Sequence, residues 1–197
     1  DSGLPLLVDP GTYAYFKHPD WRRYFRSTAA HNTVRLDDCE QSILAGPFFA
    51  ECPAETQVLS IGAAHIEAQH TGYTRLPRPV IHRRRASLNA RGLQLDDYLS
   101  GKGRHDIELF FHFDPRVTVS REGADVLVRG PQRDWLFTLD ERLSIDLYYG
   151  DEAEFHGWHS RGLNRKEPAY CVAARVSAEL PLHFRTLITP HAAGREK

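Results

Sequence analysis

The chain has 197 residues, of which 41% are hydrophobic and 26% are charged, and its formal net charge is −1. This composition is ordinary for a globular protein with a packed core, and no run approaches the roughly 18 apolar residues that a membrane-spanning segment needs. A near-neutral chain without a basic stripe is not expected to bind nucleic acid, so an acidic glycan would have to be held by local arginine clusters. Two such clusters are present, Arg22, Arg23 and Arg26 in one and Arg83, Arg84 and Arg85 in the other.

The length predicts one domain, because β-sandwiches commonly reach about 200–250 residues as single units. The sequence begins at Asp1, directly before an apolar strand, and contains no methionine, so we expect a fragment of a longer protein. We predict that residues 1–197 form a single β-sandwich domain, truncated at its N-terminal side, with a frayed tail at residues 192–197. The three cysteines are too few and too irregularly spaced for a disulfide framework, although one bridge, for example between Cys39 and Cys52, is left open.

The first predicted elements are two strand-like segments with a short helix between them. An apolar run ends at Asp9, and a second extended segment opens at His31. Between them, residues 19–25 could form a short helical turn with a proline at its first position. Connections bring sequential strands together, so Asp9 and His31 can meet in space although they are well separated along the chain.

Alternation of apolar and polar residues dominates the rest of the chain. Between residues 107 and 114 the odd-numbered side chains are apolar and most even-numbered ones are polar, which predicts a half-buried strand. Residues 117–119 and 126–128 flank a short glycine-containing loop, which predicts a hairpin. Further strands are expected at residues 81–88, 93–99, 135–139, 143–148, 170–176 and 182–188. Many short strands separated by turns predict an all-β fold, an antiparallel β-sandwich.

Asp9 and His31 are the candidate metal ligands. A carboxylate and an imidazole suit zinc, but zinc prefers three or four protein ligands, so this pair would be an incomplete set. Two alternatives remain open: Asp9 precedes Pro10-Gly11 and could merely cap the backbone of a turn, and His31 could be a satisfied core histidine. Asn32 would point to the opposite face of an extended segment, where it would orient the backbone or a neighbouring group rather than bind the same ion.

The arginine cluster at residues 22–26 is interleaved with aromatic residues. Trp21, Arg22 and Arg26 are the candidate substrate-binding residues, because guanidinium groups bind carboxylates bidentately and aromatic rings stack on the apolar faces of sugars. The alternative is a solvated turn beside a buried aromatic cluster. Tyr13 and Tyr24, in the same neighbourhood, are the candidate catalytic residues, although most aromatic residues of β proteins serve packing.

Other charged and histidine groups give weaker signals. The run of arginines at 83–85 lies in a predicted strand, so alternation predicts two surface charges and one arginine paired inward. His65 and His70, and likewise His156 and His159, are an odd number of residues apart, which places the members of each pair on opposite faces of a strand. A zinc hydrolase complete within this chain would need its third ligand from His65, His70 or His82, and nothing in the spacing requires that.

Four segments resemble the C-terminal β-domain of heparinase II/III-type polysaccharide lyases. They are residues 9–13 (DPGTY), 25–37 (FRSTAAHNTVRLD), 70–73 (HTGY) and 80–84 (VIHRR), and the likeness spans about residues 4–190. The resemblance implies a supersandwich-like antiparallel β-sandwich preceded by an (α/α) toroid. It also implies that Asp9 and His31 are zinc ligands whose third partner, a histidine, precedes residue 1. Tyr24 would correspond to a tyrosine near the lyase cleft, and the toroid would carry the other catalytic residues.

The resemblance further implies a function. A uronate lyase removes the C5 proton, stabilises the resulting enolate-like carboxylate and protonates the departing 4-oxygen. We therefore expect the chain to be the C-terminal domain of a lyase that cleaves an anionic, uronate-containing glycan by β-elimination, with a structural Zn²⁺ and little activity of its own. Its expected partners are the acidic polysaccharide and the toroid, and its expected location is the periplasm or the cell exterior. The alternative is a non-catalytic carbohydrate-binding or structural β-sandwich.

Overall fold

The computed structural model describes residues 3–192, which are mostly β-structure. One α-helix, α1 (Pro19–Arg26), and a 3₁₀ helix, Thr28–Ala30, precede the strands. The strands are β1 (Val34–Leu36), β2 (Ile43–Ala45), β3 (Phe49–Cys52), β4 (Thr56–Gly62), β5 (His65–His70), β6 (Ile81–Asn89), β7 (Gly92–His112), β8 (Thr118–Glu122), β9 (Asp125–Arg129), β10 (Asp134–Thr138), β11 (Ser144–Tyr149), β12 (Trp158–Gly162), β13 (Arg165–Pro168) and β14 (Tyr170–His191).

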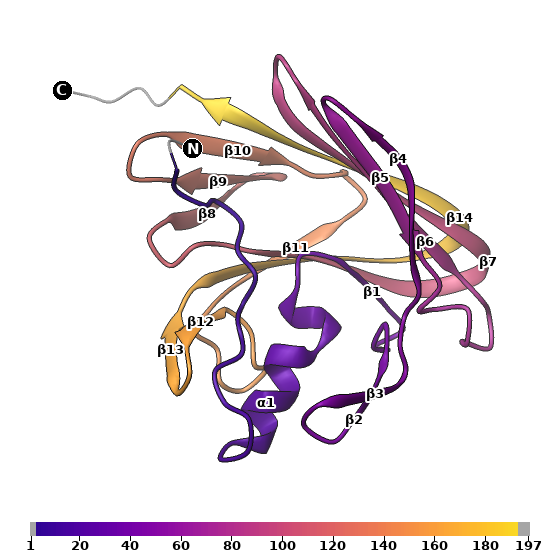
Figure 1. The fold of residues 1–197 in the computed structure, drawn as a ribbon. Coiled ribbons are helices and arrows are strands. Elements are labelled where there is room, and N and C mark those ends of the chain that lie inside the picture. The colour runs from indigo at the N-terminus through magenta and orange to yellow at the C-terminus, as the bar shows by residue number, and fades with distance from the viewer. Residues whose placement is uncertain (1–2, 193–197) are drawn as a thin grey trace.

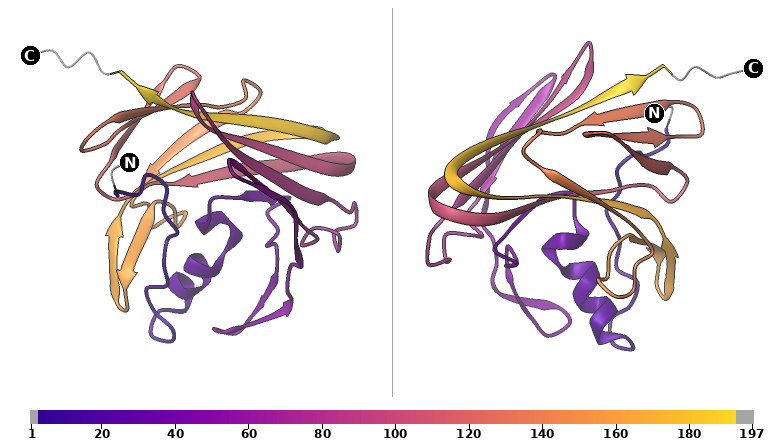
Figure 2. Two further views of the ribbon diagram at one scale, coloured as in Figure 1. Left: turned by 45° about the horizontal axis from the view of Figure 1, so that its top comes forward. Right: turned by 180° about the vertical axis from the view of Figure 1, so that it is seen from behind.

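Two long antiparallel strands, β7 and β14, form the spine of the molecule. Their pairing runs from Cys171 opposite His112 to Ile188 opposite Leu93, with one shift of register near Leu180. Both strands bend together, so the sheet folds over on itself (Figures 1 and 2). One layer has the order β4-β5-β6-β7-β14-β10-β9-β8, and the opposite ends of β7 and β14 carry β1 and β11 in the other layer. This is the antiparallel β-sandwich predicted from the sequence.

The main core lies between the two layers. Leu95 and Leu99 from the first half of β7 belong to the same buried cluster as Leu109 and Phe111 from its second half. These side chains come from both arms of one bent strand. The core is therefore buried only when the two arms fold over each other and close the sandwich. Each fully buried side chain of this kind contributes roughly 1.5–3 kcal/mol to the stability.

The end of β7 from Leu109 to His112 is buried on both faces, as are the next two residues, so the prediction of a half-buried strand at residues 107–114 was wrong. Phe110, on the face turned away from the main core, is fully buried against Ala29 and Cys171, and His112 is buried on the same side. The covering material is the 3₁₀ helix and the N-terminal segment, whose Leu7 forms a β-bridge with Phe113. This second buried face is where the candidate site is assembled.

Several local predictions are confirmed. The helix α1 begins with Pro19 as expected, and β8 and β9 form the predicted hairpin around Gly123. The segments predicted as strands at 93–99 and 107–114 belong to one continuous strand, β7, which ends at His112, and those at 170–176 and 182–188 are one strand, β14. Cys39, Cys52 and Cys171 are all free thiols. The expected frayed tail lies, except for Ala192, outside the described residues.

Within residues 3–192, no helix is long and apolar enough to cross a membrane.

Candidate functional site

The structure brings Asp9 and His31 together at the end of β7. Val8 donates its backbone N–H to the carbonyl of His112 at 3.0 Å, which fixes the segment that carries Asp9. The 3₁₀ helix leads into His31, and the following strand β1 pairs with β7 through Val34 and Leu109. As a result, Nδ1 of His31 lies 2.8 Å from Oδ2 of Asp9. The predicted encounter of these two side chains is confirmed.

Both side chains of this pair reach the surface. The exposed fraction is 70% for the Asp9 side chain and 38% for the His31 side chain, so His31 is not a core histidine. The hydrogen bond from His31 lowers the pKa of Asp9, which stays ionised. The other carboxylate oxygen accepts the N–H of Gly11 at 3.0 Å. Asp9 therefore caps its turn and contacts His31 at the same time, and a carboxylate oriented on an imidazole is a common arrangement around bound zinc.

The donor set suits zinc but is incomplete in this part of the chain. Within residues 3–192, no three histidine, cysteine or acidic side chains are grouped so that they could share an ion. His112 lies nearby, but its Nε2 contacts the carbonyl of Ala29 at 2.9 Å in the protein interior. Burial lowers the pKa of His112 to about 3, so it is a neutral donor to that carbonyl. Asp9 and His31 remain the two candidate ligands.

Asn32 ties the two ligand-bearing segments to β7. Its side-chain amide donates to the carbonyl of Val8 at 2.8 Å, and its side-chain oxygen accepts the backbone N–H of His112 at 2.7 Å. One side chain thus satisfies a backbone group beside Asp9 and another at the end of β7. This arrangement agrees with the expectation that Asn32 orients the backbone next to the site.

A buried polar network around Asp97 holds the segment that carries Asn32. Asp97 is almost fully buried and accepts two hydrogen bonds from Arg84, from Nε at 2.7 Å and from Nη2 at 3.0 Å. The remaining terminal nitrogen of Arg84 donates to the carbonyl of Asn32. Arg83 and Arg85, on the other face of β6, both pair with Glu67. The prediction that one arginine of this run is paired inward is therefore confirmed.

Two histidines extend this network through a directed chain of hydrogen bonds. Nδ1 of His70 accepts the N–H of Gly72, so Nε2 carries the proton and donates to Nδ1 of His82 at 3.1 Å. Nε2 of His82 then donates to Asp97 at 2.7 Å. Burial lowers the pKa of His70 to about 4, and the positive charge of Arg84 acts in the same direction. The chain of bonds requires His70 to be neutral.

This geometry predicts a loss of stability in acid. An unfolded histidine takes up its proton below about pH 6.5, whereas folded His70 does so only near pH 4. Between these values the unfolded state binds more protons, so the free energy of unfolding falls as the pH is lowered. Urea unfolding at several pH values between 7 and 4 should show a shallower slope for His70→Gln than for the unchanged protein. His191→Gln, at an exposed position, should leave the slope unchanged; an identical slope for both variants would contradict this assignment.

The aromatic candidates form a packed cluster between α1 and the β12–β13 hairpin. Tyr24 is 5% exposed, and burial raises the pKa of its hydroxyl, which accepts the N–H of Trp158 at 3.4 Å. The Trp21 ring lies edge-on to Trp158, and the ammonium group of Lys166 sits 3.8 Å from its centre. Tyr13 is half-buried, and within the described residues its hydroxyl makes no hydrogen bond. Of the two tyrosines, Tyr13 is the less buried, and its hydroxyl has no partner among the described residues.

The conformation of Tyr13 is set by its neighbours. Its backbone has φ +59°, a left-handed conformation held by the hydrogen bond from its N–H to Oγ of Ser160 at 2.9 Å. Gly11, two residues earlier, also has a positive φ, and a Cβ there would collide with the carbonyl oxygen of Ser160. The DPGTY segment thus fits closely along β12, which explains the glycine at this position.

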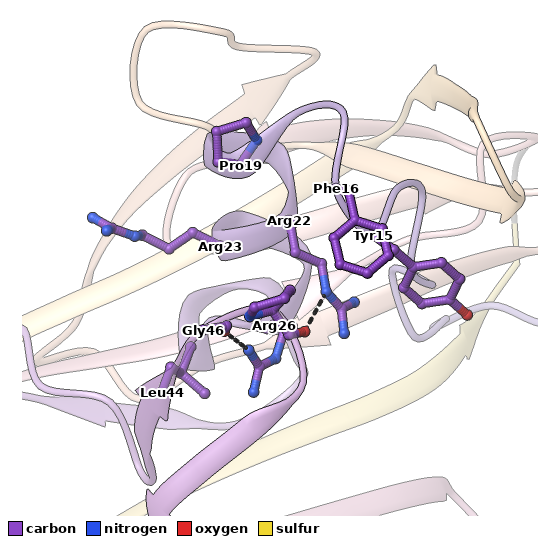
Figure 3. A pocket seen from close by; sticks show the side chains of 9 residues that line it. Tyr15, Phe16, Pro19, Arg22, Arg23, Arg26, Leu44 and Gly46 are labelled. Carbon is purple, nitrogen blue, oxygen red and sulfur yellow. Dashed lines mark hydrogen bonds between the residues drawn. The ribbon is translucent and has the colours of Figure 1, made fainter.

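The predicted substrate-binding arginines line a cavity of about 350 Å³ at the surface of α1 (Figure 3). Arg22 donates from Nε to the carbonyl of Pro47 at 2.9 Å, and Arg26 donates from both terminal nitrogens to the carbonyls of Gly46 and Phe49. Arg26 is therefore largely committed to holding the β2–β3 turn. Among the described residues, Arg23 makes no hydrogen bond or ion pair, although it lines the same cavity.

Sequence reasoning missed the groups that complete these sites. Arg84, Asp97 and the two histidines of the network come together only through the pairing of β5, β6 and β7, and no local pattern marks them as partners. The cavity beside α1 was missed for the same reason, because its far wall comes from the β2–β3 turn. Paired charges in adjacent predicted strands would have been the only signal for the network.

Comparison with known proteins identifies the family and the fold of the chain. The family described as heparinase II/III-like, C-terminal, matches residues 1–185. A solved heparinase III gene product superposes with a TM-score of 0.69 and 20% identity, over 94% of this chain and 28% of that one. The heparan sulfate lyase HepC from Pedobacter heparinus gives 0.72 and 14%, over 98% and 29%. A further heparinase III gives 0.72 and 16%, over 95% and 28%.

These structural matches establish the fold and its place in larger proteins. At such identities the likeness concerns the fold alone, and the chain spans less than a third of the length of each solved protein. No curated protein matches the chain by sequence. The predicted type of fold, the antiparallel β-sandwich that forms the C-terminal part of heparinase III structures, is confirmed.

Proposed function

Because the chain belongs to the heparinase II/III-like, C-terminal family, we propose that it is the β-sandwich domain of a polysaccharide lyase that cleaves an anionic, uronate-containing glycan by β-elimination. The observation that carries the proposal is the Asp9–His31 pair, 2.8 Å apart and open to solvent, on a domain of this family. In this proposal the larger protein supplies an N-terminal toroid, and the glycan is bound between the toroid and this domain.

Asp9 and His31 would hold a structural zinc ion together with a histidine from a segment before Asp1. Bound zinc would supply a fixed link between three parts of the chain. Asn32 and the hydrogen bond from Val8 hold the Asp9 segment against β7 without the ion, so this half of the site is preorganised. The exposure of both side chains leaves room for a ligand from another segment.

For the chemistry of this domain we propose Tyr13 rather than Tyr24 as the residue that reaches the substrate. A general acid or base must come within hydrogen-bond distance of the reacting proton. The hydroxyl of Tyr24 is enclosed by the aromatic cluster and contacts Trp158, whereas that of Tyr13 has no partner in the described part of the chain. Most of the catalytic groups would lie on the toroid, so the chain alone is expected to be inactive.

The test combines metal analysis with an activity assay. We expect stoichiometric zinc in a version of the protein extended upstream of Asp1, and loss of that zinc in the Asp9→Ala/His31→Ala double variant. The matched control is His159→Ala/Glu167→Ala, which removes another histidine–carboxylate pair, 3.5 Å apart, and should keep the metal. The extended protein should also produce unsaturated uronate ends from an acidic glycan. Zinc retained by the Asp9/His31 double variant would contradict the ligand assignment.

A non-catalytic carbohydrate-binding domain is the second candidate function. It is favoured by one observation, the surface cavity beside α1 that combines aromatic rings with arginines. Unsaturated product formed by the extended protein would decide for the lyase. Glycan binding without product would decide for the binding module.

A further inference from the structure

The cavity beside α1 has the composition of an anion site with an aromatic wall. Three arginines of α1 line it, together with Tyr15, Phe16 and the β2–β3 turn, and none of the described residues that line it is acidic. Its volume of about 350 Å³ falls within the range of sites for small molecules, roughly 300–1,000 Å³. Three unneutralised cations around one hollow favour a negatively charged occupant.

The wall of this cavity is rigidly held. The hydrogen bonds of Arg22 and Arg26 to Pro47, Gly46 and Phe49 fasten the β2–β3 turn to the helix. Arg22 makes its bond to Pro47 through Nε, so the terminal nitrogens of Arg22 remain available to a ligand. The same guanidinium group lies 5.3 Å from the centre of the Tyr15 ring and 5.7 Å from that of Phe48.

The two aromatic residues that line the cavity, Tyr15 and Phe16, are open to solvent, and so is Phe48, which packs against both of them. Phe16 is 73% exposed, Phe48 is 50% exposed, and their ring centres are 5.3 Å apart. Tyr15, 42% exposed, contacts Phe48 as well. Exposed aromatic rings that form a contiguous patch mark binding surfaces more often than isolated ones do.

Arg23 is the free cation of the site. It is exposed on α1, and within the described residues no carboxylate or carbonyl contacts its guanidinium group. Figure 3 shows Arg23 extending to one side of the helix and the rings of Tyr15 and Phe16 lying to the other, with Arg22 and Arg26 between them. A ligand that spans the cavity would therefore meet apolar surface at one end and an unpaired positive charge at the other.

We propose that this cavity is a binding subsite for an anionic sugar residue, in which Arg23 binds its carboxylate or sulfate group and the rings of Tyr15, Phe16 and Phe48 contact its apolar face. A pyranose ring with one acidic substituent presents both chemistries at once, whereas a simple anion would not use the rings. The proposal rests on the proposed function for the class of ligand. It replaces Trp21, whose ring is enclosed by neighbours, with the three exposed rings as the stacking surface.

The test is a calorimetric and NMR titration of the chain with three probes: an oligogalacturonate, a sulfated dextran oligosaccharide and a neutral dextran oligosaccharide. The first two distinguish carboxylate from sulfate, and the neutral probe should not bind. We expect Arg23→Gln to weaken binding of the preferred acidic probe about tenfold, the loss of one charge-assisted contact. Phe16→Ala should weaken it several-fold. Arg91→Gln removes the same charge at an exposed turn and should have no effect.

Three outcomes would overturn the subsite. Equal weakening by Arg23→Gln and Arg91→Gln would show diffuse charge attraction, and equal binding of the neutral probe would remove the role of the arginines. No binding by the chain, with shielding of Phe16 from solvent in the extended protein, would assign the cavity to contact with another part of the protein. Binding through Arg23 in a protein that forms no unsaturated product would sustain the subsite while the lyase proposal fails.

Discussion

Replacing Asp97 by asparagine is expected to lower the free energy of unfolding by about 3–5 kcal/mol, because it leaves Arg84 without the charge that balances it. Asp97 lies on the inward face of β7 with Leu95 and Leu99, is 1% exposed, and accepts hydrogen bonds from Arg84 and His82. These partners hold the pKa of Asp97 far below its usual range despite the burial. Asparagine keeps the shape and one acceptor oxygen, but its amide nitrogen replaces the oxygen that accepts from Nη2 of Arg84, so that donor loses its partner.

Urea unfolding at pH 7 would measure this loss. The matched control is Asp38→Asn, which makes the same chemical change in the ion pair with Arg35, where the Asp38 side chain is 84% exposed. Exposed pairs of this kind contribute about 0–1 kcal/mol, so the two variants should differ severalfold in their effect. Equal, small losses in both variants would contradict the view that the buried network is a main support of the fold near the site.

Asn32→Ala is expected to lower the free energy of unfolding by about 2–4 kcal/mol, since it leaves two backbone groups without partners at about 1–3 kcal/mol each. The N–H of His112 is buried and the carbonyl of Val8 is half-buried, and both bond to the Asn32 side chain. The change should also weaken zinc binding by the extended protein about 10–100-fold, the usual effect of removing a group that orients metal ligands.

Two comparisons make this prediction specific. Asn89→Ala removes an amide that contacts only Arg91 in an exposed turn, so it should cost well under half as much stability and leave metal affinity unchanged. Asn32→Asp keeps the acceptor for His112 but loses the donor to Val8, so its effect should be intermediate. Full metal affinity in Asn32→Ala would mean that the Asp9 and His31 segments hold their positions without this bridge.

Local signals in the sequence predicted the elements whose structure is determined locally. Pro19 marked the start of α1, and the glycine-containing loop between the valine-rich runs marked the β8–β9 hairpin. The encounter of Asp9 and His31 was also within reach, because each ends or opens an extended segment beside β7. In these cases neighbouring residues carry the information that decides the conformation.

Predictions failed where distant parts of the chain decide the structure. The segments 93–99 and 107–114 were predicted as separate strands, but pairing with β14 on both sides of Gly101 and Gly103 makes them parts of one bent strand, β7. His112 was expected on the polar face of a half-buried strand, but the N-terminal segments that pack on this face bury it together with Phe110. The carbonyls that hold Arg22 and Arg26 come from a turn about 20 residues later, which no periodicity could reveal.

The position of β14 as the last strand has a consequence for synthesis on the ribosome. It is the hydrogen-bonding partner of β7, β10 and β11, and thus joins strands that are made long before it. Until residues 170–191 emerge, these strands keep open edges, which are the sites at which nascent chains pair wrongly or aggregate. Closure of the sandwich therefore waits for the synthesis of residues 170–191, and a chain that ends before them would leave β7, β10 and β11 without their shared partner.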